Sequence, residues 1–292
     1  MLACLGSILF SAKAIVAKLT YRYGVDALTV MGFRMLFALP FFAVIAALQA
    51  RRARLGKIER LNGRDVLKIL ALGFIGYYLS SYLDFLGLQY ISAGLERLIL
   101  FLSPTFVLLI SALYLKRRIT SLQWLALGLS YLGVALAFVH DLSFVGSNVL
   151  LGSGLVLASA VTYAIYLISS GEFLKKVGST RLVAYAMSAS TAYVLLHFLV
   201  QKGWGELIQP AGVYQLSIVH AVLHTVLPTF MIMWAVARIG APLTSQLGMV
   251  GPVSVLFLAW WILDEPLTML QLAGTALVLA GMLVLGRVRP AK

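Results

Sequence analysis

The chain has 292 residues, of which 61% are hydrophobic and only 11% are charged. A soluble domain averages roughly 45–50% apolar and about 25% charged residues, so this composition excludes a cytoplasmic globular enzyme, a disordered protein and a nucleic-acid-binding protein. The formal net charge of +13 does not alter this, because the basic residues form short clusters between apolar runs, as in membrane proteins. Cys4 is the only cysteine, which excludes a disulfide framework and a cysteine-based metal site.

Apolar runs between polar clusters predict an all-α, polytopic membrane protein with ten transmembrane helices. A spanning helix needs about 20 apolar residues. The runs are too long for barrel strands, and the first lacks the basic start of a signal peptide. The predicted spans are 1–20, 27–49, 66–89, 93–115, 121–139, 149–171, 180–201, 213–237, 242–263 and 267–286.

The distribution of lysine and arginine predicts the orientation of these spans in the membrane. With the N-terminus in the cytoplasm, 17 of the 23 basic residues fall on the cytoplasmic side and 4 on the outer edge. Lys13 and Arg34 remain within the membrane. The positive-inside rule therefore predicts a protein of the cell (inner or plasma) membrane with both termini in the cytoplasm. The cytoplasmic basic clusters are expected to contact anionic lipid headgroups.

The second half of the chain repeats the first. A constant offset of 148 residues aligns Pro104 with Pro252 and Gly133 with Gly281, among other matches. Residues 1–140 and 149–287 would each hold five spans, and because five is odd, the second copy would enter the membrane from the opposite side. The charges agree, since the equivalent turns 115–120 and 263–268 are basic and acidic respectively.

Several local motifs carry a resemblance to a known family. They are Tyr23-Gly24-Val25-Asp26 followed by Arg34, Pro104 with Leu115 to Thr120, and Pro252 with Leu263-Asp264-Glu265-Pro266-Leu267-Thr268 leading to Gly274 and Gly281. With these features the chain resembles EamA-type transporters of the drug/metabolite transporter superfamily. The resemblance implies ten spans, a cavity lined by spans 1, 3, 4, 6, 8 and 9, and secondary transport of small metabolites, often outward. Arg117 departs from the family pattern, which has a glutamate there; the second copy keeps it as Glu265.

Polar residues follow one face of four predicted helices, each within about 100° of arc at helical spacing. We interpret the four stripes as the lining of a polar cavity; the alternative is hydrogen bonding between helices that only tightens their packing. Gln246, beside the last stripe, is included as a candidate lining residue. The stripes are Tyr77, Ser80, Ser81 and Asp84; Gly152, Ser159, Thr162, Tyr163, Tyr166 and Ser170; Ser217, His220, His224 and Pro228; and Ser245, Gly248, Met249 and Pro252.

Five ionisable residues are predicted to gather in the outer half of the membrane: Lys13, Arg34, Asp84, Glu96 and Arg97. In the functional interpretation, Lys13 or Arg34 holds a carboxylate or phosphate of the substrate and Asp84 carries a proton. In the alternative, the five form a neutralising network that closes an outer gate or fixes helix packing. Glu96 and Arg97 could also reach the membrane surface as snorkelling side chains.

Pro104 and Pro252 lie at equivalent mid-span positions and are predicted to act as hinges or to free a carbonyl for the substrate. The alternative is a kink that only improves packing.

His220 and His224 share one helix face and are interpreted as a proton or hydrogen-bonding pair lining the cavity. A metal site would need a third ligand, and only His197 and Glu206 lie at a suitable depth, so no metal or other cofactor is expected. Asp264 and Glu265 are predicted to lie in an exposed outer turn. The glycines of spans 5 and 10 (Gly128, Gly133, Gly274 and Gly281) are interpreted as close-packing positions or as a homodimer face.

The sequence thus favours a secondary transporter, in the direction of export, for amino-acid-like or other carboxylate-bearing solutes. Alternating access coupled to protons is expected, because neither an ATP-binding loop nor a sodium site can be recognised. The partners would be a small solute and the bilayer, with no nucleic acid. An intramembrane enzyme, with Ser153 as the nucleophile, and a non-transporting scaffold remain as alternatives.

Overall fold

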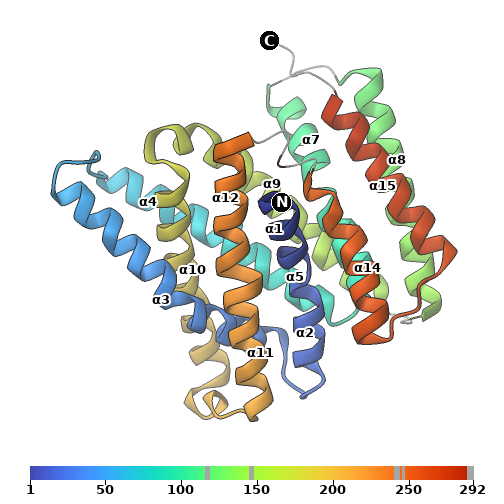
Figure 1. Cartoon of the computed structure of the whole chain (residues 1–292), viewed down its shortest axis with the longest axis horizontal. Helices are drawn as coiled ribbons and strands as arrows, with labels where there is room; N and C mark the ends of the chain where they lie inside the picture. The colour runs from blue at the N-terminus through green and yellow to red at the C-terminus, as the bar shows by residue number, and fades with distance from the viewer. Residues whose placement is uncertain (116–118, 145–147, 240–243, 245–246, 288–292) are drawn as a thin grey trace.

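A computed structural model describes residues 1–115, 119–144, 148–239, 244 and 247–287 (Figure 1). These residues contain helices and turns but no strand. Nine helical stretches among them are long and apolar enough to cross a membrane, and one further apolar helix is shorter. The prediction of an all-α protein with ten spans is therefore confirmed.

The spans are built from the following helices. Span 1 is α1 (Leu2–Ser11) with α2 (Lys13–Tyr21), span 2 is α3 (Ala27–Arg54), span 3 is α4 (Gly63–Leu72), η1 (Gly73–Leu79) and α5 (Ser80–Leu88), span 4 is α6 (Ala93–Leu100) with α7 (Ser103–Leu115), and span 5 is α8 (Ser121–Phe144). Span 6 is α9 (Val149–Val177), span 7 is α10 (Ser179–Lys202), span 8 is α11 (Ala211–Ala221), η3 (Val222–Val226) and α12 (Leu227–Ile239), span 9 contains α14 (Val250–Leu263), and span 10 is α15 (Met269–Arg287). The short 3-10 helix η2 (Trp204–Leu207) follows span 7.

Polar residues at the starts of the spans satisfy backbone N–H groups that have no partner within the helix. Asp26 accepts from the backbone N–H of Thr29 at the start of α3. Asn62 and Asp65 form a reciprocal capping box at the start of α4. Spans 2 and 7 end near Gly56 and Gly203, whose positive φ angles of 70° and 76° suit glycine.

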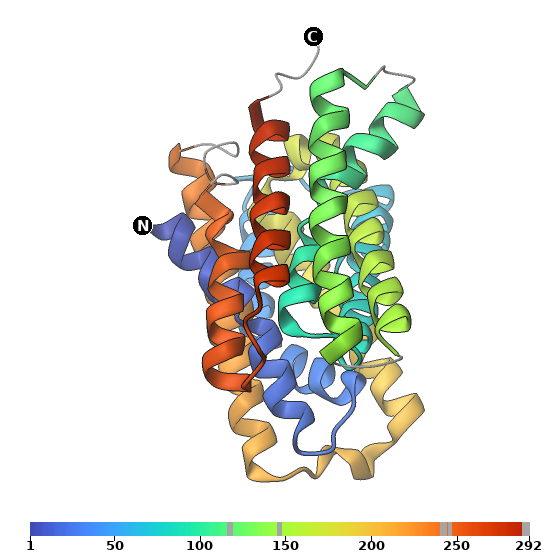
Figure 2. The ribbon, with the colours of Figure 1, turned by 90° about the vertical axis from the view of Figure 1, so that its right-hand side faces the viewer.

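Two peripheral pairs of helices flank the bundle. α8 packs along α15 on one side (Figures 1 and 2), and α3 packs across α10 on the other (Figure 1). A Cβ atom on Gly133 would lie 2.4 Å from the carbonyl oxygen of Gly274, and one on Gly281 would lie 2.7 Å from that of Ala126. These three glycines therefore serve close packing within the chain, as one of the two interpretations predicted. A Cβ on Gly128, by contrast, would meet no neighbouring atom within 4 Å.

Spans 4 and 9 are interrupted just before the two equivalent prolines. α6 ends at Leu100 and α7 begins at Ser103, so Pro104 is the second residue of a new helix. Pro252 is the third residue of α14, which begins after a turn at Met249. A proline ring clashes with the carbonyl four residues earlier, which accounts for a break at this position.

Spans 3 and 8 each contain a wide π-helical turn. These turns, η1 and η3, occupy nearly the same place under the 148-residue offset. Tyr77 lies in the first and His224 in the second. Single π turns are frequent at functional sites, and no sequence pattern indicated them.

Candidate functional site

A buried cluster of charged side chains joins spans 1, 3 and 4. The ammonium of Lys13 forms an ion pair with Asp84, and its Nζ lies 3.5 Å from Oε1 of Glu96. Lys13 is 8% exposed, Asp84 2% and Glu96 not at all. Buried charges are costly unless they are paired, so one lysine stabilises two carboxylates here.

Two phenylalanine rings separate three cations in the same cluster. The Nζ of Lys13 lies 5.8 Å from the ring centres of both Phe10 and Phe85. The Cζ of Arg97 lies 5.5 Å from the ring of Phe10, and that of Arg34 lies 4.7 Å from the ring of Phe85. The cations and rings therefore alternate in the order Arg97, Phe10, Lys13, Phe85, Arg34, at distances typical of cation–π contacts.

The structure thus brings together the five ionisable residues that were singled out in the sequence. Glu96 and Arg97 do not reach the surface, since Arg97 is only 7% exposed and Glu96 is fully buried. Sequence reasoning missed the two rings, because a phenylalanine within an apolar run carries no distinguishing signal.

The ion pairs of the cluster are unevenly distributed among its cations. Both carboxylates lie beside Lys13, whereas no ion pair joins either arginine to a carboxylate among the described residues. The Nε atoms of Arg34 and Arg97 are buried without a hydrogen-bond acceptor. Oδ1 of Asp84 and both carboxylate oxygens of Glu96 also lack a hydrogen-bond donor. The site therefore offers both donors and acceptors to a bound molecule.

The two histidines of span 8 face spans 1 and 3. Nδ1 of His224 lies 2.7 Å from the carbonyl oxygen of Leu9. His220 is fully buried with neither ring nitrogen hydrogen-bonded, and its ring centre lies 5.5 Å from that of Phe85. Among the described residues, no three His, Cys, Asp or Glu side chains gather as metal ligands would. His220 thus belongs to the charged cluster, while His224 ties span 8 to span 1.

The polar stripes of spans 3 and 6 face each other. The hydroxyls of Tyr77 and Tyr166 lie 3.0 Å apart, and those of Ser80 and Ser159 lie 3.1 Å apart. The ring of Tyr163 stacks on that of Tyr166 at 5.7 Å. In these two spans the stripes form direct hydrogen bonds between helices, as the packing alternative predicted.

Of the three remaining candidates, two lie within the described residues. Ser81, a member of the stripe of span 3, is half-buried. Gln246 lies outside the described residues. Oγ of Ser153 is buried without a hydrogen-bond partner, so no described base is placed to activate it.

Glu265 requires a correction, because the prediction of an exposed outer turn is wrong for this residue. Glu265 is 6% exposed; its carboxylate accepts from the backbone N–H of Ala93 and lies 3.3 Å from Nζ of Lys18. The start of α6 explains this, since its unpaired N–H groups and helix dipole attract an acid. Asp264 is exposed as predicted, with a positive φ of 60°.

A second acid holds the same helix end. The carboxylate of Asp141, at the end of α8, accepts from the backbone N–H of Ser92 at 2.6 Å and from its hydroxyl at 2.7 Å. The hydroxyl of Ser92 in turn accepts from the backbone N–H of Leu95. The start of α6 is therefore fixed by groups from span 5 and from the turn after span 9. Sequence reasoning missed Asp141, although an acid at the end of an apolar run could have indicated it.

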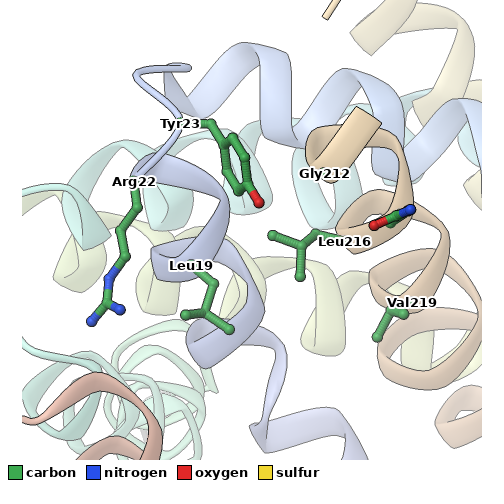
Figure 3. A pocket seen from close by; sticks show the side chains of 7 residues that line it. Leu19, Arg22, Tyr23, Gly212, Leu216 and Val219 are labelled. Carbon is green, nitrogen blue, oxygen red and sulfur yellow. The ribbon is translucent and has the colours of Figure 1, made fainter. Parts of the chain in front are cut away.

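Two hollows lie at opposite ends of the seam between spans 1 and 8. The larger, of about 490 Å³, lies between α2 and α11; the apolar residues Leu19, Leu216 and Val219 line it together with the polar Tyr23 and Gln215 (Figure 3). Arg22 borders it but extends away, and its Nη2 donates to the carbonyl of Leu263. The smaller, of about 240 Å³, lies beside Met1 and Arg238. Between the two hollows, His224 of span 8 contacts the carbonyl oxygen of Leu9 in span 1.

The comparisons with known proteins agree with one another. A family model described as the EamA-like transporter family matches residues 1–139 and again 150–287. The uncharacterized transporter YcbK of Bacillus subtilis (strain 168) is 30% identical over 92% of this chain and 86% of its own length. An uncharacterized transporter of Archaeoglobus fulgidus is 29% identical over 95% and 99%. A protein of Streptantibioticus cattleyicolor named a probable terminal-alkyne amino-acid exporter is 27% identical over 91% and 87%.

A solved crystal structure has a similar fold. It superimposes with a TM-score of 0.63 and 17% sequence identity, covering 97% of this chain and 95% of the other. At this identity the likeness concerns the fold alone.

Proposed function

The chain belongs to the EamA-like transporter family, and on that premise we propose that it is a proton-coupled secondary transporter that exports amino-acid-like or other carboxylate-bearing solutes. It is an integral membrane protein. The proposed place is the cell membrane, with both termini in the cytoplasm, where the basic clusters meet anionic lipid. Substrate would bind between the two repeats, and rocking of the repeats would expose the site to one side at a time.

The observation that carries this proposal is the buried cluster around Lys13. Three cations and two carboxylates lie within the membrane-spanning part of the protein. Burying them there costs free energy, and apolar side chains could pack the same helices without that cost. Nε of Arg34 and of Arg97 has no hydrogen-bond acceptor, and the carboxylate of Glu96 has no hydrogen-bond donor in addition to its ion pair with Lys13. Such a set complements a solute that carries both a carboxylate and an ammonium group. The named amino-acid exporter among the relatives supports the same class of solute.

Proton coupling is proposed through Asp84. Its carboxylate forms the ion pair with Lys13, which also lies beside Glu96. Protonation of Asp84 would release Lys13 from this pair, and a cationic group of the solute would favour the ionised acid. Proton and solute would then compete for the same carboxylates, which is one way to couple their movements.

Alternating access requires contacts that open and close at each end of the bundle. At the end that we propose to be external, Glu265 joins Lys18 and Ala93, and Arg22 donates to Leu263. At the other end, Lys176 pairs with Asp65 at 2.9 Å, and Nη1 of Arg181 donates to the carbonyl of Glu59 at 2.7 Å. We propose that these two sets break in turn.

Transport is tested with purified protein in liposomes loaded with one unlabelled amino acid at a time. Counterflow of the labelled amino acid supports the proposal, whereas chemical change of the solute without any gradient would indicate an enzyme instead. Asp84→Asn then tests the coupling: we expect counterflow to persist while proton-driven accumulation is lost. Unchanged accumulation would exclude Asp84 as the carrier.

The orientation needs a separate measurement. In a Cys4→Ser background, single cysteines at Gly56 and Asp264 are labelled with a membrane-impermeant maleimide in whole cells. The proposal requires labelling at position 264 and protection at position 56. Equal labelling of both would contradict the inverted arrangement of the two repeats.

A further inference from the structure

A group of unpaired donors lies where spans 1, 4 and 9 meet. Ser11 is fully buried, and its Oγ has no hydrogen-bond partner. Arg97 reaches the same place from α6, and its Nε has no acceptor. Both approach Gly251 in the first turn of α14: a Cβ on Gly251 would lie 2.4 Å from Oγ of Ser11 and 3.5 Å from Nη2 of Arg97.

The chemistry of this place calls for an anion. A guanidinium offers only donors, and a serine hydroxyl can donate as well. The two carboxylates of the cluster are drawn to Lys13 rather than to Arg97. A buried donor without an acceptor costs free energy, so an unfilled acceptor position beside Arg97 and Ser11 indicates that another molecule supplies it.

We propose that Arg97 and Ser11, at the start of α14, bind the carboxylate of the transported solute. Glu96, the preceding residue, has no hydrogen-bond donor at either carboxylate oxygen; its Oε1 lies 3.5 Å from Nζ of Lys13, and the carboxylate receives the ammonium group of the same solute beside that lysine. The head group of a free α-amino acid carries a carboxylate and an ammonium group on the same carbon atom. This inference rests on the proposed function and names the residues that bind the charged groups of the solute.

Arg97 suits this role better than Arg34. Arg34 and His220 both lie against the ring of Phe85, and His220 has one unprotonated ring nitrogen that can accept a hydrogen bond. Arg97 lies against Phe10 and approaches Gly251 together with the hydroxyl of Ser11, which can donate to the same anion. The site also joins α6 of the first repeat to α14 of the second. A carboxylate bound there would change the contacts between the repeats, as transport requires.

The test compares free amino acids with their carboxamides, which lack the anion. L-leucine, L-phenylalanine and L-serine, each paired with its amide, are titrated against purified protein by thermal shift, since a ligand of the folded state raises the melting temperature. The wild type is expected to bind at least one acid and to bind its amide more weakly. Loss of a hydrogen bond to a charged group should make Ser11→Ala bind the acid roughly tenfold more weakly.

Ser190→Ala is the matched control, because Ser190 on α10 is also fully buried with an unpaired hydroxyl, while α10 packs against α3, η1 and α4 rather than against α1, α6 or α14, which form the proposed site. It should bind as the wild type does. Arg97→Lys keeps the charge but loses the planar fork, and it should reduce the preference for acid over amide. Because Oγ of Ser11 makes no hydrogen bond in the structure, Ser11→Ala should fold even if Arg97→Lys does not.

The outcomes separate the two proposals. If the wild type neither binds nor exchanges any of these amino acids, the proposed solute class fails. If it binds them and both Ser11→Ala and Arg97→Lys keep the wild-type affinity and preference, the carboxylate site proposed here is wrong while the transport function stands.

Discussion

The backbone N–H of Ala93 donates to the carboxylate of Glu265, which is 172 residues away in the chain; the nitrogen lies 3.2 and 3.1 Å from its two oxygens. Ala93 is the first residue of α6, and Glu265 follows α14. The contact therefore joins span 4 of the first repeat to the turn after span 9 of the second. Lys18 of span 1 completes it. Glu265 thus holds three spans together at one end of the bundle.

Replacing Glu265 should loosen that end. Glu265→Ala removes the acceptor of Ala93 and the partner of Lys18, and a hydrogen bond to a charged group contributes about 1.5–3 kcal/mol. We expect a cysteine at Leu88, which is 2% exposed in the neighbouring apolar core, to react with an impermeant maleimide about tenfold faster or more. The measurement uses the Cys4→Ser background. Asp264→Asn, in the same turn but exposed, should leave the rate unchanged; equal acceleration by both variants would contradict a specific role for Glu265.

The glycine contact between α8 and α15 predicts a sharp difference between two positions on one helix. A Cβ on Gly133 would lie 2.4 Å from the backbone oxygen of Gly274, which has no flexible side chain that could yield. Gly133→Ala should therefore destabilise the protein by about 1–3 kcal/mol, as overpacked sites do. Gly128→Ala meets nothing within 4 Å and should be neutral or stabilising by about 0.5–1 kcal/mol. Thermal unfolding in detergent measures both, and equal melting temperatures would refute this packing role.

The sequence predicts the spans and the charged cluster for related reasons. A run of about 20 apolar residues has one stable arrangement in lipid, and a charge within such a run must find partners. Lys13, Arg34, Asp84, Glu96 and Arg97 could therefore be grouped by depth alone. Their pairing could not be predicted, because which carboxylate approaches Lys13 depends on the rotation of each helix.

The contacts of other residues depend on tertiary packing that leaves no local pattern. Glu265 follows a turn motif that is typical of an exposed loop, yet the start of α6 lies within reach and draws it inward. Tyr77 and Tyr166 belong to stripes that suit either a cavity or a helix contact. Their hydroxyls bond directly to each other, and only the distance between spans 3 and 6 decides this.

Asp26 provides a pH-dependent contribution to stability. Burial raises its pKa, but hydrogen bonds from Lys202 and from Thr29 lower it by more, so the folded-state pKa lies below the ordinary value of 3.8. The ionised carboxylate of Asp26 therefore stabilises the folded protein. This contribution is complete above pH 3.8 and is lost as the pH falls through the folded-state pKa. Oδ2 of Asp26 lies 2.7 Å from Nζ of Lys202, which ties span 2 to span 7.

Asp26→Asn should therefore melt at a lower temperature than the wild type at neutral pH. The difference should shrink as the pH falls below 3.8, because the unfolded chain then binds a proton that the folded Asp26 still resists, and it is lost once the pH passes the folded-state pKa. Melting curves of both proteins across this range give the measurement. A difference that stays constant down to pH 3 would mean that the charge of Asp26 does not stabilise the fold.

The break in span 4 has a specific hydrogen-bonding basis. Pro104 has no N–H for the carbonyl of Leu100, and the hydroxyl of Ser103 donates to that carbonyl instead, at 2.6 Å. In span 9, the hydroxyl of Ser254 donates to the carbonyl of Gly251 at 2.7 Å, beside Pro252. The chain also contains Pro40 inside α3, where the helix continues without interruption. A proline alone therefore does not break a span here.

Pro104→Ala tests whether the break serves transport. Alanine restores the N–H and favours a continuous helix across residues 101 and 102, so the melting temperature should stay equal or rise. If the break is a hinge, the rate of counterflow in liposomes should fall severalfold, because the two halves of span 4 can no longer tilt independently. Pro40→Ala is the matched control, since it changes a proline in a span that remains one helix, and its counterflow should match that of the wild type. Wild-type counterflow in Pro104→Ala would show that the interrupted helix serves packing rather than movement.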